Sequence, residues 1–274
     1  MSERVTVRKT YKLFIGGKFP RSESGRSYLV QSSNVSLASR KDARDAVVAA
    51  RAAVKGWAGA TAYNRGQILY RAAEMLEGRR EQFVALGIGG DEVDAAVDRW
   101  VWYAGWADKL AQVYGGANPV AGPYFNISAP EPTGVVAVVA PERPALLGLV
   151  SVIAPAIVTG NTVVVAASPS EPLAAVTLAE VLATSDLPGG VVNVLTGAIT
   201  ETAPTLASHL DVNAIDLTGV TDASLATELE VKAAENLKRV LRPAAGETDW
   251  TADPGVTRMT ALLETKTVWH PKGV

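Results

Sequence analysis

The sequence of 274 residues contains no cysteine. Without a thiol the chain can form no disulfide, bind no metal through sulfur, and attack no carbonyl through a cysteine nucleophile. Histidine is almost as scarce, because only His209 and His270 are present and they lie far apart along the chain. Two isolated histidines do not match the ligand spacing of a zinc site. We therefore expect no metal site, and we assign both histidines to surface or capping positions.

An excess of charge of either sign is also lacking, because 26 Lys and Arg oppose 28 Asp and Glu for a formal net charge of -2. We expect neither a nucleic acid nor an anionic membrane as a partner. The longest apolar run, Leu146 to Thr159, contains Pro155 and is shorter than the roughly 20 residues that span a bilayer. The segment Met1 to Lys9 resembles neither a signal nor a transit peptide, so we expect a cytoplasmic protein.

The overall composition, with 48% hydrophobic and 20% charged residues, is typical of a globular protein. The first third predicts helices. A capping-box pattern at Ser39 to Asp42 starts one that runs to Trp57, a second begins near Thr61, and a third runs from Asp91 toward Leu110. We assign the aromatic residues of the third helix to helix packing rather than to a ligand site. These are Trp100, Trp102 and Trp106.

From Gly134 onward, short β-branched runs alternate with helical stretches. The runs are Val135–Val139, Thr162–Val165, Val191–Leu195 and Ala214–Leu217. The stretches are Leu146–Thr159, Leu173–Thr184 and Glu201–Ser208. This alternation predicts an α/β fold, with a Rossmann-like parallel sheet and helices on both faces. Such sheets bind ligands beyond the carboxyl ends of their strands, so a site is expected in the turns that follow these runs.

After Lys238 the pattern weakens into a polar stretch rich in proline and glycine, which indicates a linker. The last segment, Thr265 to His270, is again typical of a strand and ends at Pro271. A lone terminal strand needs a sheet to join.

Several phrases resemble the aldehyde dehydrogenase superfamily, in family order, along nearly the whole chain. They are Leu13–Lys18 (LFIGGK), Tyr103–Leu110 (YAGWADKL), Glu131–Val136 (EPTGVV), Gly160–Val164 (GNTVV), Leu187–Thr196 (LPGGVVNVLT) and Leu237–Val240 (LKRV). The resemblance implies a nucleotide-binding domain, a catalytic domain holding a cysteine nucleophile, and a small oligomerisation arm. It also implies thiolate attack on an aldehyde, hydride transfer to NAD(P), and a glutamate that activates water.

The family's functional positions are replaced in this chain. Arg143 stands at the position of the oxyanion-binding Asn, and Pro243 at that of the glutamate base. The Lys and Glu that grip the adenosine ribose correspond to Ala166 and Pro169. Val220 replaces a serine that faces the pyrophosphate. We therefore expect no catalytic residue and no bound cofactor; NAD stays open as an alternative, although its site is degraded.

The family's catalytic domain corresponds here to a short linker, after which Met259 to Trp269 resembles the family's C-terminal strand. We assign residues 1–118 and 134–246 to the nucleotide-binding domain and 247–255 to the linker. Residues 119–133 and 256–274 are assigned to a small β oligomerisation arm, formed by a hairpin around Val120 to Pro132 and by the C-terminal strand. In family dimers the C-terminal strand adds to the partner's catalytic-domain sheet, which this chain lacks.

The leading hypothesis is therefore a catalytically inactive subunit that docks on a full-length aldehyde dehydrogenase by strand addition, as a structural or regulatory partner. The docking residues would be Tyr124, Phe125, Ile127, Thr267, Val268 and Trp269. One alternative is a stand-alone binder of an NAD-type nucleotide. Another is NAD(P)-dependent aldehyde oxidation only within a hetero-oligomer. A third is new chemistry at the old cleft, where Glu142, Arg143 and Glu171 could gather, although such charges usually form surface salt bridges. The partner's substrate and the stoichiometry stay open.

Overall fold

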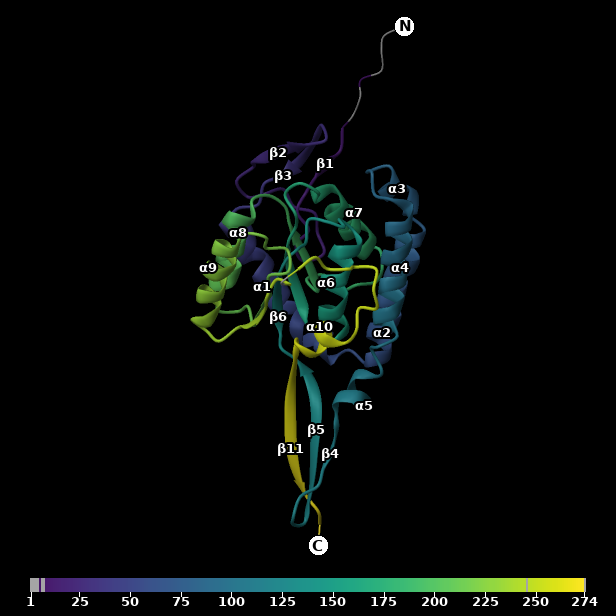
Figure 1. Ribbon diagram of the computed structural model, residues 1–274, viewed down its shortest axis with the longest axis vertical. Helices are drawn as coiled ribbons and strands as arrows, with labels where there is room; N and C mark the ends of the chain where they lie inside the picture. The colour runs from purple at the N-terminus through teal and green to yellow at the C-terminus, as the bar shows by residue number, and fades with distance from the viewer. Residues whose placement is uncertain (1–4, 6–7, 245, 274) are drawn as a thin grey trace.

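The computed structural model describes residues 5, 8–244 and 246–273. Most of Met1 to Lys9 and the predicted domain limits at residues 1 and 274 therefore lie outside the described residues. At the centre is a sheet of five parallel strands in the order β10-β9-β6-β7-β8 (Figure 1). They are β6 (Val135–Val139), β7 (Thr162–Ala166), β8 (Val192–Leu195), β9 (Ala214–Asp216) and β10 (Arg239–Leu241). This confirms the predicted Rossmann-like α/β fold.

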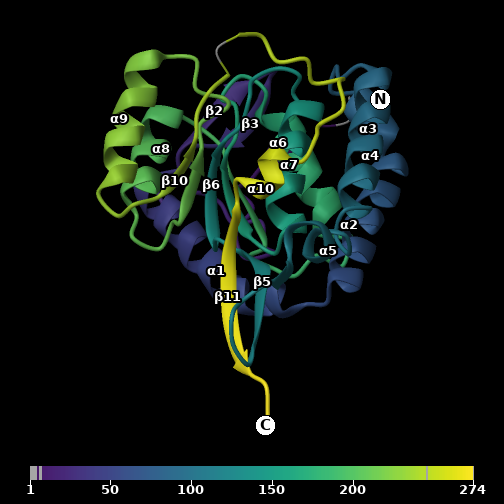
Figure 2. The same ribbon diagram turned by 60° about the horizontal axis from the view of Figure 1, so that its bottom comes forward.

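The central strands are apolar on both faces, because helices cover each side of the sheet. Along β6, alternate side chains point to opposite faces. Val136 and Val138 enter the larger core cluster, whereas Val135 and Val139 enter the smaller one. In Figures 1 and 2, α2, α4, α6 and α7 lie on one side of the sheet and α1, α8 and α9 on the other. Buried residues of the first group belong to the larger cluster, and those of the second group belong mainly to the smaller one. The helices are α1 (Arg40–Gly59), α2 (Ala62–Glu77), α3 (Arg80–Val84), α4 (Gly90–Ala104), α5 (Leu110–Tyr114), α6 (Leu147–Val158), α7 (Pro172–Leu182), α8 (Ile199–Ser208), α9 (Ala223–Ala234) and α10 (Thr257–Thr260).

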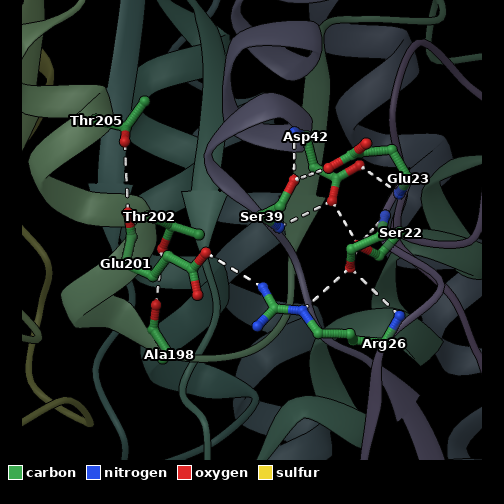
Figure 3. Close-up of polar contacts among 10 residues, drawn as sticks. Ser22, Glu23, Arg26, Ser39, Asp42, Ala198, Glu201, Thr202 and Thr205 are labelled. Carbon is green, nitrogen blue, oxygen red and sulfur yellow. Dashed lines mark hydrogen bonds and ion pairs between the residues drawn. The ribbon is translucent and has the colours of Figure 1, made fainter.

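Helix α1 begins with the predicted capping box. The Ser39 hydroxyl accepts from the Asp42 amide (3.3 Å), and the Asp42 carboxylate accepts from the Ser39 amide (2.8 Å). The same carboxylate accepts from the Ser22 hydroxyl (2.7 Å) and from the Glu23 amide (3.1 Å), as Figure 3 shows. The cap therefore also ties the preceding loop to the helix. That loop leads into a small sheet in the order β1-β3-β2, formed by Thr10–Tyr11, Ser33–Ser36 and Ser27–Val30 respectively.

A three-stranded arm projects from the body in both views (Figures 1 and 2). Its order is β11-β5-β4, with both neighbours antiparallel to β5. The strands are β4 (Gly116–Asn118), β5 (Tyr124–Pro132) and β11 (Leu263–Pro271). The predicted terminal strand therefore joins the predicted hairpin. Leu263 lies opposite Pro132 and Pro271 opposite Tyr124, so the ladder runs the full length of both strands.

Five features differ from the expectations. The third predicted helix is divided, because α4 ends at Ala104 and α5 begins only at Leu110. Helix α9 is an additional element, and β10 lies in the segment where the pattern weakens. The arm already begins with β4, ahead of the limit predicted at residue 119. Met259 and Leu262 are buried in the larger core, so residues 256–262 pack with the body rather than in the arm. No helix within the described residues combines the length and apolarity needed to cross a bilayer.

Candidate functional site

The sheet reverses its strand order between β6 and β9, which is where folds of this class place a ligand crevice. Here the turns that follow these two strands are in direct contact. The Gly219 amide donates to the Val139 carbonyl (3.0 Å). A Cβ at Gly219 would overlap the Ala140 carbonyl, so only glycine fits this approach. The turn after β9 therefore packs directly against the end of β6 at the switch point.

The charged residues beside this point are held by neighbouring groups. Arg143 is exposed, and its guanidinium lies 2.7 Å from a Glu171 carboxylate oxygen. The Ser170 hydroxyl donates to Glu142 (2.5 Å). Arg143 and Glu171 line a cavity of about 440 Å³ together with Glu92, whose carboxylate accepts from the first amides of α6. Of the three charges that could gather at the old cleft, Arg143 and Glu171 thus form an ion pair, whereas Glu142 accepts from a serine.

The other expected cofactor positions carry no polar side chain. Ala166 is buried at the end of β7, and Pro169 is exposed in the following loop. Val220 is buried in the smaller core cluster, and Pro243 is half-buried beyond β10. The N-terminus of α9, which follows Val220, is capped by the Asp222 carboxylate accepting from the Ser224 amide (2.8 Å). That carboxylate occupies a position at which a helix would favour a ligand anion. Whether these replacements end cofactor binding stays a prediction.

A polar cluster that the sequence did not indicate lies at the carboxyl end of β9. The buried carboxylate of Asp216 accepts from Arg258 (2.8 Å) and from the Thr218 amide (2.9 Å). Arg258 also donates to the Thr218 hydroxyl (3.0 Å). Nearby on α4, Arg99 donates to the Ser151 hydroxyl (2.8 Å). One feature of the sequence could have indicated this cluster. Arg99 lies inside a predicted helix beside Trp100, which is assigned to helix packing, so a buried arginine could have been expected there.

Two ionisable groups in this cluster are shifted by burial. Removal from solvent raises the pKa of Tyr103 to about 12, and the positive charges of Arg99 and Arg258 only partly oppose this. Removal from solvent also lowers the pKa of Arg99. Tyr103 is fully buried and its hydroxyl has no hydrogen-bond partner within the described part of the chain. The same part holds no group of three His, Asp or Glu side chains that could bind a metal.

The six residues predicted for docking lie together on the arm. Tyr124 and Trp269 contact each other edge to face, with ring centroids 5.8 Å apart. Phe125, Ile127 and Trp269 are about half exposed, at 57%, 45% and 56%. Val268 lies opposite Ile127, and the Thr267 hydroxyl contacts that of Ser128 (2.8 Å). An exposed aromatic group of this size on a thin arm is typical of a protein–protein contact. Its role stays a prediction.

The ladder also shows which backbone groups of β11 are free. Just beyond its ends, Thr133 donates to Leu262 (3.3 Å) and Lys272 donates to Pro123 (2.7 Å). Both pairs follow the strand register and are hydrogen-bonded pairs. Because such pairs alternate with non-bonded ones in antiparallel ladders, the odd-numbered residues of β11 direct their N–H and C=O groups away from β5. Thr265, Thr267 and Trp269 therefore present backbone groups at the free edge.

Comparison with protein families and with known proteins gives the family of this chain. A family model described as the aldehyde dehydrogenase family matches residues 30–251. Aldehyde dehydrogenase, cytosolic 1, of Elephantulus edwardii is 32% identical over 249 residues, which are 84% of this chain and 49% of that protein. Retinal dehydrogenase 2 of Homo sapiens is 32% identical over 259 residues, or 87% of this chain and 49% of that protein.

Solved structures agree. The NAD+ complex of an aldehyde dehydrogenase from Bacillus cereus superimposes with a TM-score of 0.78 at 27% identity, over 85% of this chain and 50% of that one. HpcC from Thermus thermophilus gives a TM-score of 0.79 at 27% identity, over 85% and 47% of the two chains. The chain spans about half the length of the curated relatives it matches. By sequence and by fold, it belongs to the aldehyde dehydrogenase family.

Proposed function

We propose that this chain is a non-catalytic member of the aldehyde dehydrogenase family that docks on a full-length aldehyde dehydrogenase through the free edge of β11. The observation that carries the proposal is the projecting arm, whose outer strand offers backbone donors and acceptors at Thr265, Thr267 and Trp269. Unpaired edges of this kind favour pairing with another sheet. The proposed complex is cytoplasmic, in keeping with the relative named cytosolic 1.

The surroundings of the edge favour a specific partner over unspecific pairing. One face of the arm carries a row of polar side chains. In it, the side-chain amide of Asn118 donates to the side-chain oxygen of Asn126 (2.5 Å) and to the Ser128 hydroxyl (2.8 Å). On the opposite face, Lys266 pairs with Glu131 (3.0 Å). At the base of the arm, Arg239 pairs with Glu264 (2.7 Å) and links β11 to the body. These contacts hold β11 in one register, in which it can pair with the edge strand of a partner's sheet.

The proposal includes the loss of catalysis and of NAD binding. The 274 residues include no cysteine, so the thiolate nucleophile of the family is missing. The positions expected to hold the ribose, Ala166 and Pro169, offer no side-chain donor. Burying the hydroxyls of a ribose without partners is costly. The Asp222 carboxylate at the start of α9 would in addition repel a pyrophosphate. These residues do not fit NAD.

The docking test uses co-expression with a full-length aldehyde dehydrogenase from the same genome. We expect one hetero-oligomeric peak in size-exclusion chromatography with light scattering. Thr267→Pro removes the edge N–H and should abolish the complex, because proline cannot donate to a ladder. Thr267→Val is the matched control, since it loses the same hydroxyl contact with Ser128 but keeps the N–H. Lack of any complex, or equal complex formation by both variants, contradicts docking.

Two further measurements test the loss of activity. Titration of the purified chain with NAD+ or NADH, followed by tryptophan emission, should give no saturable change. Saturable quenching at micromolar concentration would instead favour the alternative of a stand-alone nucleotide binder. Turnover of an aldehyde with NAD(P) by this chain alone would overturn the non-catalytic assignment. Turnover that appears only on adding this chain to its partner would favour oxidation within the hetero-oligomer.

A further inference from the structure

The segment between β10 and α10 crosses the body as an irregular strap, which comprises residues 246–255. Figures 1 and 2 show it passing from the side of β10 across to α4 and back to α10. The strap contains no helix or strand, and none of its residues is buried. Within the described part of the chain, no backbone–backbone hydrogen bond joins it to the body. Side chains must therefore hold it in place.

Arg99 on α4 makes the polar connection to the strap. Its guanidinium donates from one nitrogen to the Trp250 (2.6 Å) and Ala252 (3.1 Å) carbonyls. A second nitrogen donates to the Ser151 hydroxyl of α6 (2.8 Å). Among the residues that the structure describes, these two carbonyl bonds are the only hydrogen bonds between the strap and the body. Arg99 thus acts as a single latch.

The latch is a desolvated cation. Arg99 is 8% exposed, and removal from solvent lowers the pKa of its guanidinium. No carboxylate lies within 4.0 Å of it among the described residues. Neutral carbonyls compensate the desolvation of a charge only in part. Opening of the strap returns the guanidinium to water, which offsets part of the cost of breaking the two carbonyl bonds.

The strap also packs loosely on the body. Its Trp250 side chain is half-buried against the larger core cluster. Cavities of about 170 and 320 Å³ nevertheless lie between the strap and α4. Atoms that line such voids lose the dispersion contacts that would otherwise hold a segment down. Ser151 lines the smaller cavity and is 1% exposed, so it lies directly beneath the strap.

A glycine stands at each end of the strap. Gly255 has φ of +58°, a conformation that favours glycine, and a Cβ at Gly246 or at Gly255 would meet nothing within 4 Å. The backbone can therefore rotate at both ends without a clash against the body. Small residues that flank a moving segment are typical of hinges.

We infer that the strap is a hinged cover that opens while the body stays folded, with Arg99 as its latch and Gly246 and Gly255 as its hinges. Opening gives solvent access to Ser151 and to the Arg99 guanidinium. Access to the polar cluster beside the carboxyl end of β9 is then set by a local opening rather than by global unfolding. Strap opening is independent of docking, because the strap and the arm are separate segments of the chain.

The test is thiol labelling, because the parent chain has no cysteine. Ser151→Cys places a single thiol beneath the strap and keeps both carbonyl bonds of the latch. Val164→Cys places one in the fully buried centre of β7 and reports global unfolding. With a chromogenic disulfide reagent in native buffer, we expect Ser151→Cys to react faster by on the order of a hundredfold or more. Low urea should accelerate only Val164→Cys strongly, since local opening exposes little surface.

Two further substitutions separate the latch from general stability. Arg99→Met should speed the labelling of Ser151→Cys by on the order of tenfold, as expected when hydrogen bonds from a charged group are lost. Asp42→Ala is the matched control, because the cap that it removes lies in α1 and stays formed when the strap opens. It should accelerate the labelling of Val164→Cys but not that of Ser151→Cys.

Three results would overturn the inference. They are equal labelling rates of Ser151→Cys and Val164→Cys with the same steep dependence on urea, no effect of Arg99→Met on Ser151→Cys, and equal acceleration of both thiols by Asp42→Ala. The docking variant Thr267→Pro should leave the labelling of Ser151→Cys unchanged. A failure of docking and a failure of strap opening are therefore separate outcomes.

Discussion

Buried polar side chains in this protein are of two kinds. Asp42 is 3% exposed and its carboxylate accepts from two amides and a hydroxyl, so its desolvation is compensated. Tyr103 is fully buried and its hydroxyl has no partner within the described residues. The capping-box pattern predicted the first, because the spacing of Ser39 and Asp42 is a local signal. The second depends on packing between α4 and a segment about 150 residues away, as the Arg99 bonds show, and no local pattern contains it.

The Asp42 cap should be a strong local contributor to stability. Asp42→Ala leaves the Ser22 hydroxyl and the Glu23 and Ser39 amides without their acceptor. We expect the free energy of unfolding to fall by about 2–3 kcal/mol, measured by urea denaturation followed by circular dichroism. Asp45→Ala removes only an exposed pair with Lys41 and should change it by less than about 0.5 kcal/mol. Equal effects of the two variants would contradict the role assigned to the cap.

Tyr103 should make stability fall at high pH. Its pKa is about 12 in the folded protein, against roughly 10 in an unfolded chain. The folded state therefore holds a proton that the unfolded state has released, so this contribution is complete below about pH 10 and is lost as the pH rises toward 12. Tyr103→Phe should show a shallower loss of stability across this interval in urea denaturation. An unchanged slope would mean that the phenol ionises freely. Tyr63→Phe should keep the slope of the parent chain.

At the scale of elements, the turn into β6 depends on one glycine. Gly134 has φ of +130°, a conformation that other residues rarely adopt, and a Cβ there would overlap the Asn213 side-chain oxygen. That oxygen accepts from the Val135 amide (3.0 Å) and from Arg51 (2.5 Å). Gly134→Ala should therefore lower the free energy of unfolding by about 2–4 kcal/mol in urea denaturation.

The same substitution inside α1 should have the opposite sign. Gly56 is exposed in the helix, and a Cβ there meets nothing within 4 Å. Gly56→Ala should raise the free energy of unfolding by about 0.5–1 kcal/mol, since alanine restricts the unfolded chain and favours helix. If Gly134→Ala and Gly56→Ala both lowered the free energy of unfolding, local backbone geometry would not decide the sign of the change.

A helix or strand could be predicted where the pattern that specifies it lies within a few consecutive residues. Strands β6, β7 and β8 are short runs rich in valine, and their limits agree with the prediction within one residue. Helix α9 is absent from the prediction although Asp222 caps it, because Leu229 and Ala233 are its only buried residues and its apolar face is correspondingly narrow. The β10 strand has only three residues at the sheet edge, too short for any pattern to distinguish from a loop.

At the scale of the whole molecule, the family resemblance placed the arm more accurately than the local pattern did. The phrase at Met259 to Trp269 implied that the terminal strand and the hairpin belong together, and β11 pairs with β5. No local pattern could have assigned residues 256–262 to the body, because Met259 and Leu262 are buried by contacts with distant elements. The arm is thus joined to the core by a short helix and ends in an exposed strand.

The exposed arm and the low charge together predict the behaviour of the isolated chain. A formal net charge of -2 gives little repulsion between copies, β11 presents a free edge, and the arm carries exposed aromatic residues on β5 and β11. We expect sedimentation velocity to show reversible association that grows with protein concentration in the absence of a partner.

Thr267→Pro should shift this association toward monomer, because the edge N–H is what a second copy would pair with. Thr267→Val should associate like the parent chain, since its backbone donor is kept. If association persists equally in both variants, the aromatic side chains rather than the strand edge hold the copies together, and Trp269→Lys becomes the variant that separates them. A monomer at every concentration would mean that the edge is protected in the free chain, and strand addition to a partner would then require the arm to rearrange first.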